Sequence, residues 1–154
     1  MNSIRFFCAS DNELLAEALR ERLGALPDMK WVGWSPNAVD LTEQLRRSGA
    51  NVLLLDIDMP LVDPISALAA VTTALPGVHT LVLTGFIDRR RFDRAMAAGA
   101  SGYLMKLARG DVIVDGVRSV HAGRVVSDLA PRLVARREML FGPLSGVGAW
   151  SMWQ

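Results

Sequence analysis

The 154-residue sequence has a single cysteine, Cys8, and no long apolar run. One cysteine excludes an intrachain disulfide, which suits a reducing compartment. Cys8 lies in a short apolar stretch, and we expect it to be a small buried core residue. No segment approaches the roughly 18–20 apolar residues that cross a bilayer, and the first residues lack the sustained apolar core of a secretory signal. We therefore expect a cytoplasmic protein that does not enter the membrane.

An excess of charge of either sign is also absent. The 17 Lys and Arg residues nearly balance the 16 Asp and Glu residues, which leaves a net charge of +1. This balance gives no electrostatic reason to expect direct binding to nucleic acid or to a membrane surface. Apolar residues make up 51 % of the chain and charged residues 21 %. That composition is sufficient for the core of one globular domain of ordinary size.

Short apolar runs alternate with amphipathic stretches along the chain, and this pattern predicts five strand–helix units. We expect strands at residues 4–9, 31–35, 51–56, 78–84 and 101–105. We expect helices at residues 12–23, 37–48, 65–75, 88–98 and 111–121. The strands are apolar throughout rather than alternating, which is typical of parallel strands covered by helices on both faces. The predicted fold class is therefore α/β, with a doubly wound five-stranded parallel sheet.

Polar residues stand where these predicted strands end. They are Ser10, Asp11, Asp56, Asp58, Thr84 and Lys106. Ligand sites in such sheets lie beyond the carboxyl ends of the strands, so we expect these side chains to converge. Two carboxylates can hold Mg²⁺, a hydroxyl and an ammonium group can neutralise a transferring phosphoryl group, and an aspartate nucleophile can form an acyl phosphate.

Each of these residues also has an ordinary structural interpretation when it is taken alone. Asp56 could be a turn residue, Thr84 could bond to the backbone, and Lys106 could be a solvated charge. Their occurrence at the ends of successive strands favours a common site.

Three segments resemble the receiver domain of two-component response regulators, which has a CheY-like, flavodoxin-like fold. Residues 51–60 (NVLLLDIDMP) resemble the phosphorylation strand of that family, and residues 81–85 (LVLTG) resemble its switch-hydroxyl strand. Residues 98–106 (AGASGYLMK) resemble its G-A-x-G-Y-L-x-K segment and give the strongest match. The resemblance covers about residues 3–123, and it implies the strand order 2-1-3-4-5.

The resemblance also implies a role for each site residue. Asp56 would be the phosphoacceptor, and Lys106 would contact the phosphoryl group. Mg²⁺ would be held by Asp11, Asp56 and the main-chain carbonyl of Asp58. Thr84 would be the switch hydroxyl and Tyr103 its rotating aromatic partner. The protein would then be a phosphorylation-dependent switch in signal transduction that receives its phosphoryl group from a histidine kinase. It would catalyse only its own phosphotransfer and dephosphorylation and could form a homodimer.

Residues 123–134 (GRVVSDLAPRLV) resemble the hinge that precedes the helix-turn-helix domain of NarL/LuxR-type transcription regulators. About twenty residues follow, and none is charged after Glu138. We therefore expect a receiver domain at residues 1–123 and a linker-like helix with an uncharged tail at residues 124–154. The DNA-binding domain of the subfamily would be missing from this chain, so we expect no direct contact with nucleic acid.

Three residues depart from the family pattern. Ser10 stands where the family usually has a first acidic residue, which should weaken Mg²⁺ binding. Pro64 stands where a glycine is common, and Phe86 stands where a polar side chain often assists the hydrolytic water. Nearby, Arg89–Arg91 and Arg94 open a predicted helix, and we expect them to form a solvated face.

Two other functions remain open on the sequence alone. Ser10 is compatible with a pseudo-receiver, a binding module that keeps the fold without using phosphate. The Asp56-Ile-Asp58 sequence also resembles the opening motif of haloacid-dehalogenase-type phosphatases. That family needs an acidic metal pair well after its lysine, and Asp111 and Asp115 follow Lys106 too closely to supply one.

Overall fold

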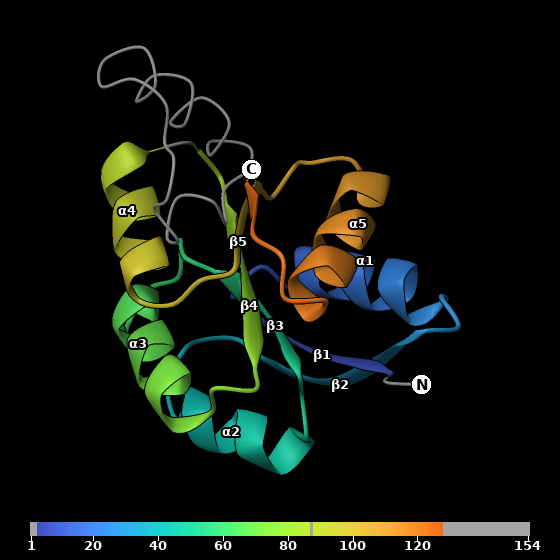
Figure 1. Cartoon of the computed structure of the whole chain (residues 1–154), viewed down its shortest axis with the longest axis horizontal. Helices are drawn as coiled ribbons and strands as arrows, with labels where there is room; N and C mark the ends of the chain where they lie inside the picture. Colours follow the sequence, from blue (N-terminus) through green and yellow to red (C-terminus); the bar gives the residue numbers. More distant parts are fainter. Residues whose placement is uncertain (1–2, 87, 128–154) are drawn as a thin grey trace, which may run out of the picture.

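The computed structural model describes residues 3–86 and 88–127 (Figure 1). The described part contains one parallel sheet in the order β2-β1-β3-β4-β5-β6. Its strands are β1 (Ile4–Ala9), β2 (Met29–Ser35), β3 (Val52–Asp56), β4 (His79–Thr84), β5 (Gly102–Met105) and β6 (Val126–Ser127). Its helices are α1 (Glu13–Gly24), α2 (Leu41–Ser48), α3 (Pro64–Ala74), α4 (Arg89–Ala97) and α5 (Gly110–His121).

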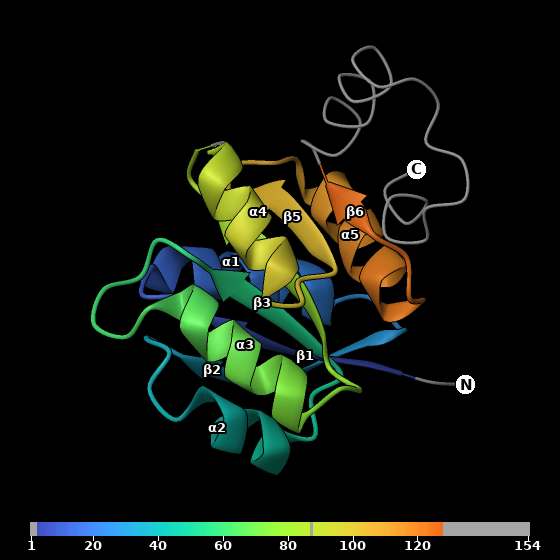
Figure 2. The same ribbon diagram turned by 60° about the vertical axis from the view of Figure 1, so that its left-hand side comes forward.

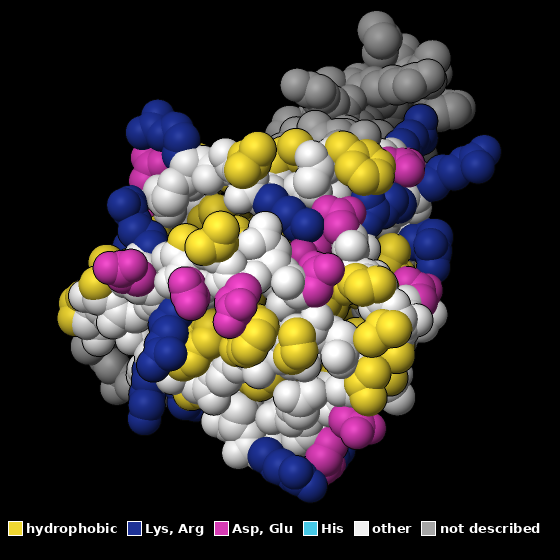
Figure 3. Space-filling view, turned by 180° about the vertical axis from the view of Figure 1, so that it is seen from behind, with side chains coloured by type: hydrophobic (Ala, Val, Ile, Leu, Met, Phe, Trp, Pro, Cys, Tyr) yellow, Lys and Arg dark blue, Asp and Glu magenta, His cyan; other side chains and the backbone are white. Residues whose placement is uncertain are grey.

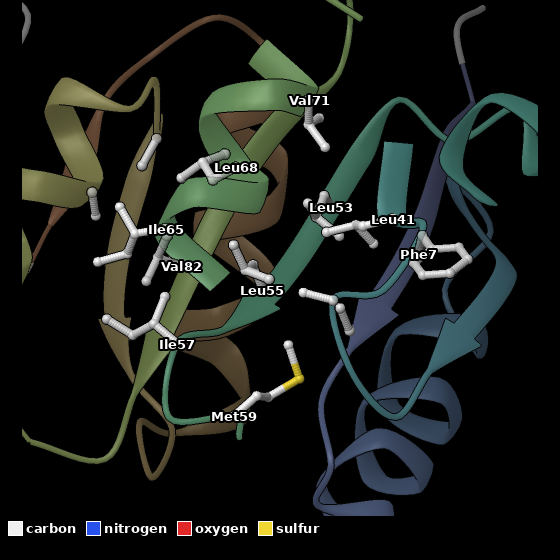
Figure 4. Packing of buried hydrophobic residues seen from close by; sticks show 14 of the residues in the cluster. Phe7, Leu41, Leu53, Leu55, Ile57, Met59, Ile65, Leu68, Val71 and Val82 are labelled. Atoms are coloured by element: carbon white, nitrogen blue, oxygen red, sulfur yellow. The ribbon is translucent and has the colours of Figure 1, made fainter. Parts of the chain in front are cut away.

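Helices cover both faces of the sheet, as the apolar strands predict. Helices α1 and α5 lie on one face, and α2, α3 and α4 lie on the other (Figure 2). Leu68 of α3 and Phe92 of α4 pack with Leu53 and Leu55 of β3 in one core, part of which Figure 4 shows. Leu54 points to the opposite face and belongs to a second core with α1 and α5. All five residues of β3 are buried, so the central strand fixes the position of the residue at its end.

Side-chain caps determine where three of the helices begin. The side chain of Asn12 accepts a 3.1 Å hydrogen bond from the backbone N–H of Leu15 at the start of α1. Asp63 and Asp88 cap α3 and α4 in the same way. A cap satisfies a backbone N–H that has no partner inside the helix. Helices α1, α3 and α4 therefore begin in the loops that follow β1, β3 and β4, at the edge of the sheet where the site is predicted.

Some predicted bounds and the number of strands differ from the structure. The helix expected at residues 37–48 begins only at Leu41, because Asp40 has a left-handed φ of 53° and Asn37 caps a turn through Val39 N. The predicted α/β fold and the strand order 2-1-3-4-5 are confirmed, but the sheet has six strands rather than five, since β6 pairs with β5 through Gly102 and Val126. The strand β6 begins past residue 123, where we placed the end of the domain. The predicted C-terminal helical extension falls almost entirely on residues 128–154, which lie outside the described residues.

The surface carries charges of both signs. Figure 3 shows Lys and Arg side chains interspersed with Asp and Glu, and hydrophobic side chains exposed at several places on this face. Among the helices of the described residues, none is both long enough and apolar enough to cross a bilayer.

Candidate phosphotransfer site

Asp56 is the last residue of β3, and its side chain is fully buried. Its Oδ1 atom lies 2.8 Å from Nζ of Lys106 and accepts a 2.8 Å hydrogen bond from the backbone N–H of Asp58. Its Oδ2 atom accepts a 2.8 Å hydrogen bond from the hydroxyl of Ser10. A buried carboxylate is costly unless it is paired and hydrogen-bonded. The partners of Asp56 come from the residue after β5, from its own loop and from the residue after β1.

Ser10 is held firmly beside Asp56, although it replaces the acidic residue that the family usually has. Its backbone N–H donates to the carbonyl of Ser35 at 2.9 Å, and its carbonyl accepts from Nε1 of Trp34 at 2.9 Å. Its hydroxyl also accepts from the backbone N–H of Asn12 at 3.1 Å. Ser10 is completely buried. Trp34 on the edge strand β2 therefore anchors the site, a role that the apolar pattern of that strand did not reveal.

Lys106 joins the two carboxylates of the β3 end. Its Nζ lies 2.8 Å from Oδ1 of Asp56 and 2.9 Å from Oδ2 of Asp58. Its backbone N–H donates a 2.7 Å hydrogen bond to the carbonyl of Thr84, which fixes the start of the loop after β5. Burial lowers the pKa of Lys106, but the hydrogen bonds and charges of the two aspartates raise it, and the pKa ends above its usual range. The ammonium group is therefore fully charged at neutral pH.

Asp58 receives more partners than the sequence led us to expect. Its Oδ2 also accepts from the backbone N–H of Gly85 at 2.7 Å, where a Cβ atom would lie 3.2 Å from the same oxygen. Its Oδ1 lies 2.5 Å from Nη2 of Arg91. Burial raises the pKa of Asp58, but Lys106, Arg91 and the Gly85 N–H lower it, and the net effect is a pKa below its usual range. Asp58 is therefore an ionised carboxylate, and both its side chain and its backbone N–H belong to the site.

Arg91 is a second site residue that the sequence analysis missed. We expected the arginines of α4 to form a solvated face, but the Arg91 side chain is only 19 % exposed. Its guanidinium group also donates to the carbonyl of Ile57 at 2.8 Å and lies 4.7 Å from the centre of the Phe86 ring. Its neighbours Arg89 and Arg94 do face solvent, with side chains 61 % and 59 % exposed. No signal in the sequence separates Arg91 from these two residues.

Thr84 is the last residue of β4, and Tyr103 lies in the neighbouring strand β5, in register with Val82. The Thr84 hydroxyl donates to the carbonyl of Phe86 at 2.8 Å, so it is turned along its own loop. Tyr103 is already buried, with its ring edge-to-face against Phe92 at 5.1 Å. Burial raises the pKa of Tyr103, while the nearby Thr84 hydroxyl acts in the opposite direction. Within the described part of the chain, the Tyr103 hydroxyl has no partner at hydrogen-bond distance.

The oxygen donors around Asp56 suit a hard cation that keeps most of its water. The Asp56 carboxylate is buried, and the exposed Asp11 follows directly on Ser10, whose hydroxyl contacts Asp56. Magnesium is often bound through one or two carboxylates with several waters retained. Within residues 3–86 and 88–127, no group of three or more His, Cys, Asp and Glu side chains could hold a metal ion. The donor set is therefore compatible with Mg²⁺ but supplies few negative oxygens.

The four charged side chains around Asp56 balance one another. Asp56 and Asp58 supply two negative charges, and Lys106 and Arg91 supply two positive charges. A carboxylate at the end of the central strand, with an ammonium group on one oxygen and a hydroxyl on the other, can act as a nucleophile toward phosphorus. The same cations can then neutralise the oxygens of the transferred group.

Comparison with known proteins identifies the family of the chain. The family model "Response regulator receiver domain" matches residues 6–118. The transcriptional regulatory protein LnrK of Bacillus subtilis is 31 % identical over 133 residues, which are 86 % of this chain and 60 % of LnrK. The response regulator UvrY of Escherichia coli is 28 % identical over 132 residues, covering 84 % of this chain and 61 % of UvrY. The chain thus spans about 60 % of the length of these curated relatives.

The solved structures show the same fold. A LuxR-family two-component response regulator from Aurantimonas superposes with a TM-score of 0.80 at 21 % identity, covering 88 % of this chain and 98 % of the other. The match to the family model spans β3, β4, β5 and most of α5, and therefore includes Asp56, Thr84 and Lys106. The chain belongs to the response-regulator receiver domains of two-component signalling systems.

Proposed function

We propose that this chain is a phosphorylation-dependent signalling switch in which Asp56 accepts a phosphoryl group from a histidine kinase. The observation that carries the proposal is the burial of Asp56 at the end of β3, with Lys106 on one carboxylate oxygen and Ser10 on the other. A buried nucleophile with positioned cations is the arrangement that phosphoryl transfer requires. The family match to receiver domains supports the same function.

In the proposed reaction, an oxygen of Asp56 forms a bond to phosphorus as the bond to the imidazole nitrogen of a phosphohistidine breaks. The electron pair of the broken bond returns to the imidazole, and the product is an acyl phosphate on Asp56. Lys106 is already within 2.8 Å of that carboxylate and would move to the phosphoryl oxygens. Mg²⁺, held by Asp11, Asp56 and the main-chain carbonyl of Asp58, would supply further positive charge beside the transferred group.

The output of the switch would pass through β4 and β5. A hydrogen bond from Thr84 to the phosphoryl group would require its hydroxyl to leave the Phe86 carbonyl. The Tyr103 ring is already buried against Phe92. The change at Tyr103 would therefore be a new partner for its hydroxyl rather than a rotation of the ring into the core. A hydrogen bond to a charged group can bias such an equilibrium by about 1.5–3 kcal/mol.

The experiment is to incubate the protein with Mg²⁺ and acetyl phosphate, a small phosphodonor, and to measure the mass of the intact protein by mass spectrometry. We expect one added phosphoryl group in the wild type and none in Asp56→Asn. Asp63→Asn is the matched control, because Asp63 caps α3 and lies outside the site. A phosphoryl group added to Asp56→Asn would show that another residue is the acceptor. No addition to the wild type would favour the pseudo-receiver, and continuous hydrolysis of phosphate monoesters would favour a phosphatase.

A further inference from the structure

One arginine of α4 connects the loop that follows Asp56 to the loop that follows Thr84. Nη2 of Arg91 contacts Oδ1 of Asp58 and the carbonyl of Ile57, and its guanidinium group stacks on Phe86. All three contacts are made by a side chain that is only 19 % exposed. The side chain of Arg91 therefore closes the flank of the site between these two loops.

With Arg91 in place, both carboxylate oxygens of Asp58 have hydrogen-bond or ion-pair partners. Oδ1 faces Arg91, while Oδ2 faces Lys106 at 2.9 Å and the N–H of Gly85 at 2.7 Å. These partners fix the orientation of the carboxylate, and turning it toward an incoming water molecule would break its contact with Arg91. The orientation of Asp58 affects the site directly, because Asp58 shares Lys106 with Asp56 and lies only two residues after Asp56.

The chain contains a natural control for this contact. Arg94 lies one helical turn beyond Arg91 and pairs with Asp63 at 3.0 Å. That pair has side chains 59 % and 45 % exposed, whereas those of Arg91 and Asp58 are 19 % and 21 % exposed. Exposed ion pairs contribute little and are screened by salt, while buried pairs are screened much less. The two arginines have the same chemistry on the same helix, but only Arg91 reaches the site.

We propose that Arg91 is a positioning residue that prolongs the life of the acyl phosphate by holding the Asp58 carboxylate away from the hydrolytic water. The inference rests on the proposed function, since it presupposes a phosphoryl group on Asp56. In hydrolysis, the oxygen of a water molecule bonds to phosphorus as the bond from phosphorus to the Asp56 oxygen breaks. Asp56 regains its carboxylate, and the proton that the water loses passes to the released phosphate or to bulk water. Once Arg91 is removed, Oδ1 of Asp58 is free to orient that water and to accept its proton.

The test compares the loss of phosphate after donor removal in the wild type, Arg91→Gln and Arg94→Gln. We expect Arg91→Gln to lose phosphate at least about fivefold faster, and Arg94→Gln to match the wild type. Arg91→Lys keeps a positive charge beside Asp58 and is expected to recover part of the lifetime, which a defect of folding would not explain. Thermal melting of each variant shows whether it is folded at the assay temperature.

A double-mutant cycle shows whether Arg91 acts through Asp58. In an Asp58→Asn background, we expect Arg91→Gln to cause no further change in the decay rate, because the carboxylate that Arg91 restrains is gone. An equal acceleration in both backgrounds would overturn the proposal, and so would an unchanged lifetime in Arg91→Gln.

Two other readouts separate this proposal from the proposed function. The amount of phosphate bound at time zero tests the function, and the rate of its loss tests Arg91. Loading with unaltered decay in Arg91→Gln would overturn only the role of Arg91, whereas no loading of the wild type would overturn both. In the phosphate-free protein, NMR of the arginine side chains should show restricted guanidinium rotation for Arg91 that is lost in Asp58→Asn. Free rotation in the wild type would also overturn the proposal.

Discussion

Ser10 donates a hydrogen bond to Oδ2 of Asp56, while Lys106 occupies Oδ1 of the same carboxylate. A neutral hydroxyl thus stands where receiver domains usually have a carboxylate, and the buried charges of the site balance without a metal. We therefore expect the site to attract a divalent cation less strongly than a site with an additional acid would.

We expect Ser10→Asp to tighten Mg²⁺ binding about tenfold, which corresponds to ~1.4 kcal/mol, because it adds a negative oxygen ligand. Isothermal titration calorimetry measures this directly. Without Mg²⁺, the same variant should be less stable to urea than the wild type, since two carboxylates then face each other in a buried position. Ser10→Ala is the control, because it removes the hydrogen bond and adds no ligand. Unchanged or weaker Mg²⁺ binding in Ser10→Asp would contradict this prediction.

Phe86 is the second residue after Thr84, and its ring is 54 % exposed. An apolar ring cannot position a water molecule for attack on the phosphoryl group, and losing one positioning contact typically costs about tenfold in rate, ~1.4 kcal/mol. We therefore expect Phe86→Gln and Phe86→Glu to shorten the lifetime of the acyl phosphate by about that factor. The measurement is phosphate loss against time after the donor is removed.

The stacking of Arg91 on Phe86 requires a further control for that experiment. Phe86→Leu removes the ring but stays apolar, so we expect it to keep a lifetime closer to that of the wild type. If the acyl phosphate of Phe86→Leu is lost as fast as that of Phe86→Gln, the loss of stacking rather than the gain of a polar group sets the rate of hydrolysis. Equal decay in all the variants would show that Phe86 does not control the lifetime.

The hydroxyl of Tyr103 is buried and lacks a hydrogen-bond partner among the described residues. A buried polar group without a partner costs about 1–3 kcal/mol. We expect Tyr103→Phe to leave the free energy of unfolding unchanged or to raise it by about 1 kcal/mol in the phosphate-free protein, as measured by urea denaturation. Tyr103→Leu should lower it by about 1–3 kcal/mol, because the edge-to-face contact with Phe92 is lost. A marked loss of stability in Tyr103→Phe would mean that the hydroxyl is satisfied.

The pKa of Asp58 predicts a dependence of stability on pH. Burial raises this pKa, but Lys106 and Arg91 hold it below the ordinary value of 3.8. The folded protein therefore binds fewer protons at Asp58 than the unfolded chain does. The corresponding stability is present above the ordinary value and is lost as the pH falls through the folded pKa. Urea denaturation between pH 6 and pH 3 should show that the free energy of unfolding falls less steeply with pH in Asp58→Asn than in the wild type. The slope for Arg91→Gln should lie between these two. Identical slopes in the wild type and Asp58→Asn would contradict this.

The local elements of the fold were predictable because their signals are short-range. The strand β1 has the predicted bounds, and the buried run of β3 differs by one residue. Caps at Asn12, Asp63 and Asp88 mark where α1, α3 and α4 begin. The start of α2 was not predictable, because the left-handed Asp40 interrupts a stretch that still has a helical pattern. The strand β6 is two residues long and exists only because β5 offers a free edge.

For the site, the order of residues along the chain determined which strand ends carry Ser10, Asp56, Thr84 and Lys106, and parallel strands bring those ends to one edge of the sheet. Only the tertiary structure decided that the Asp58 side chain is shared between Lys106 and Arg91, and that Trp34 anchors Ser10. The arginines at positions 89, 91 and 94 have the same chemistry in the sequence. Arg91 and Arg94 are three residues apart and share one face of α4, so the helical pattern cannot tell them apart. The placement of α4 over the loops after β3 and β4 brings Arg91 to Asp58, while Arg94, one turn further along, pairs with the exposed Asp63 and Arg89 faces solvent.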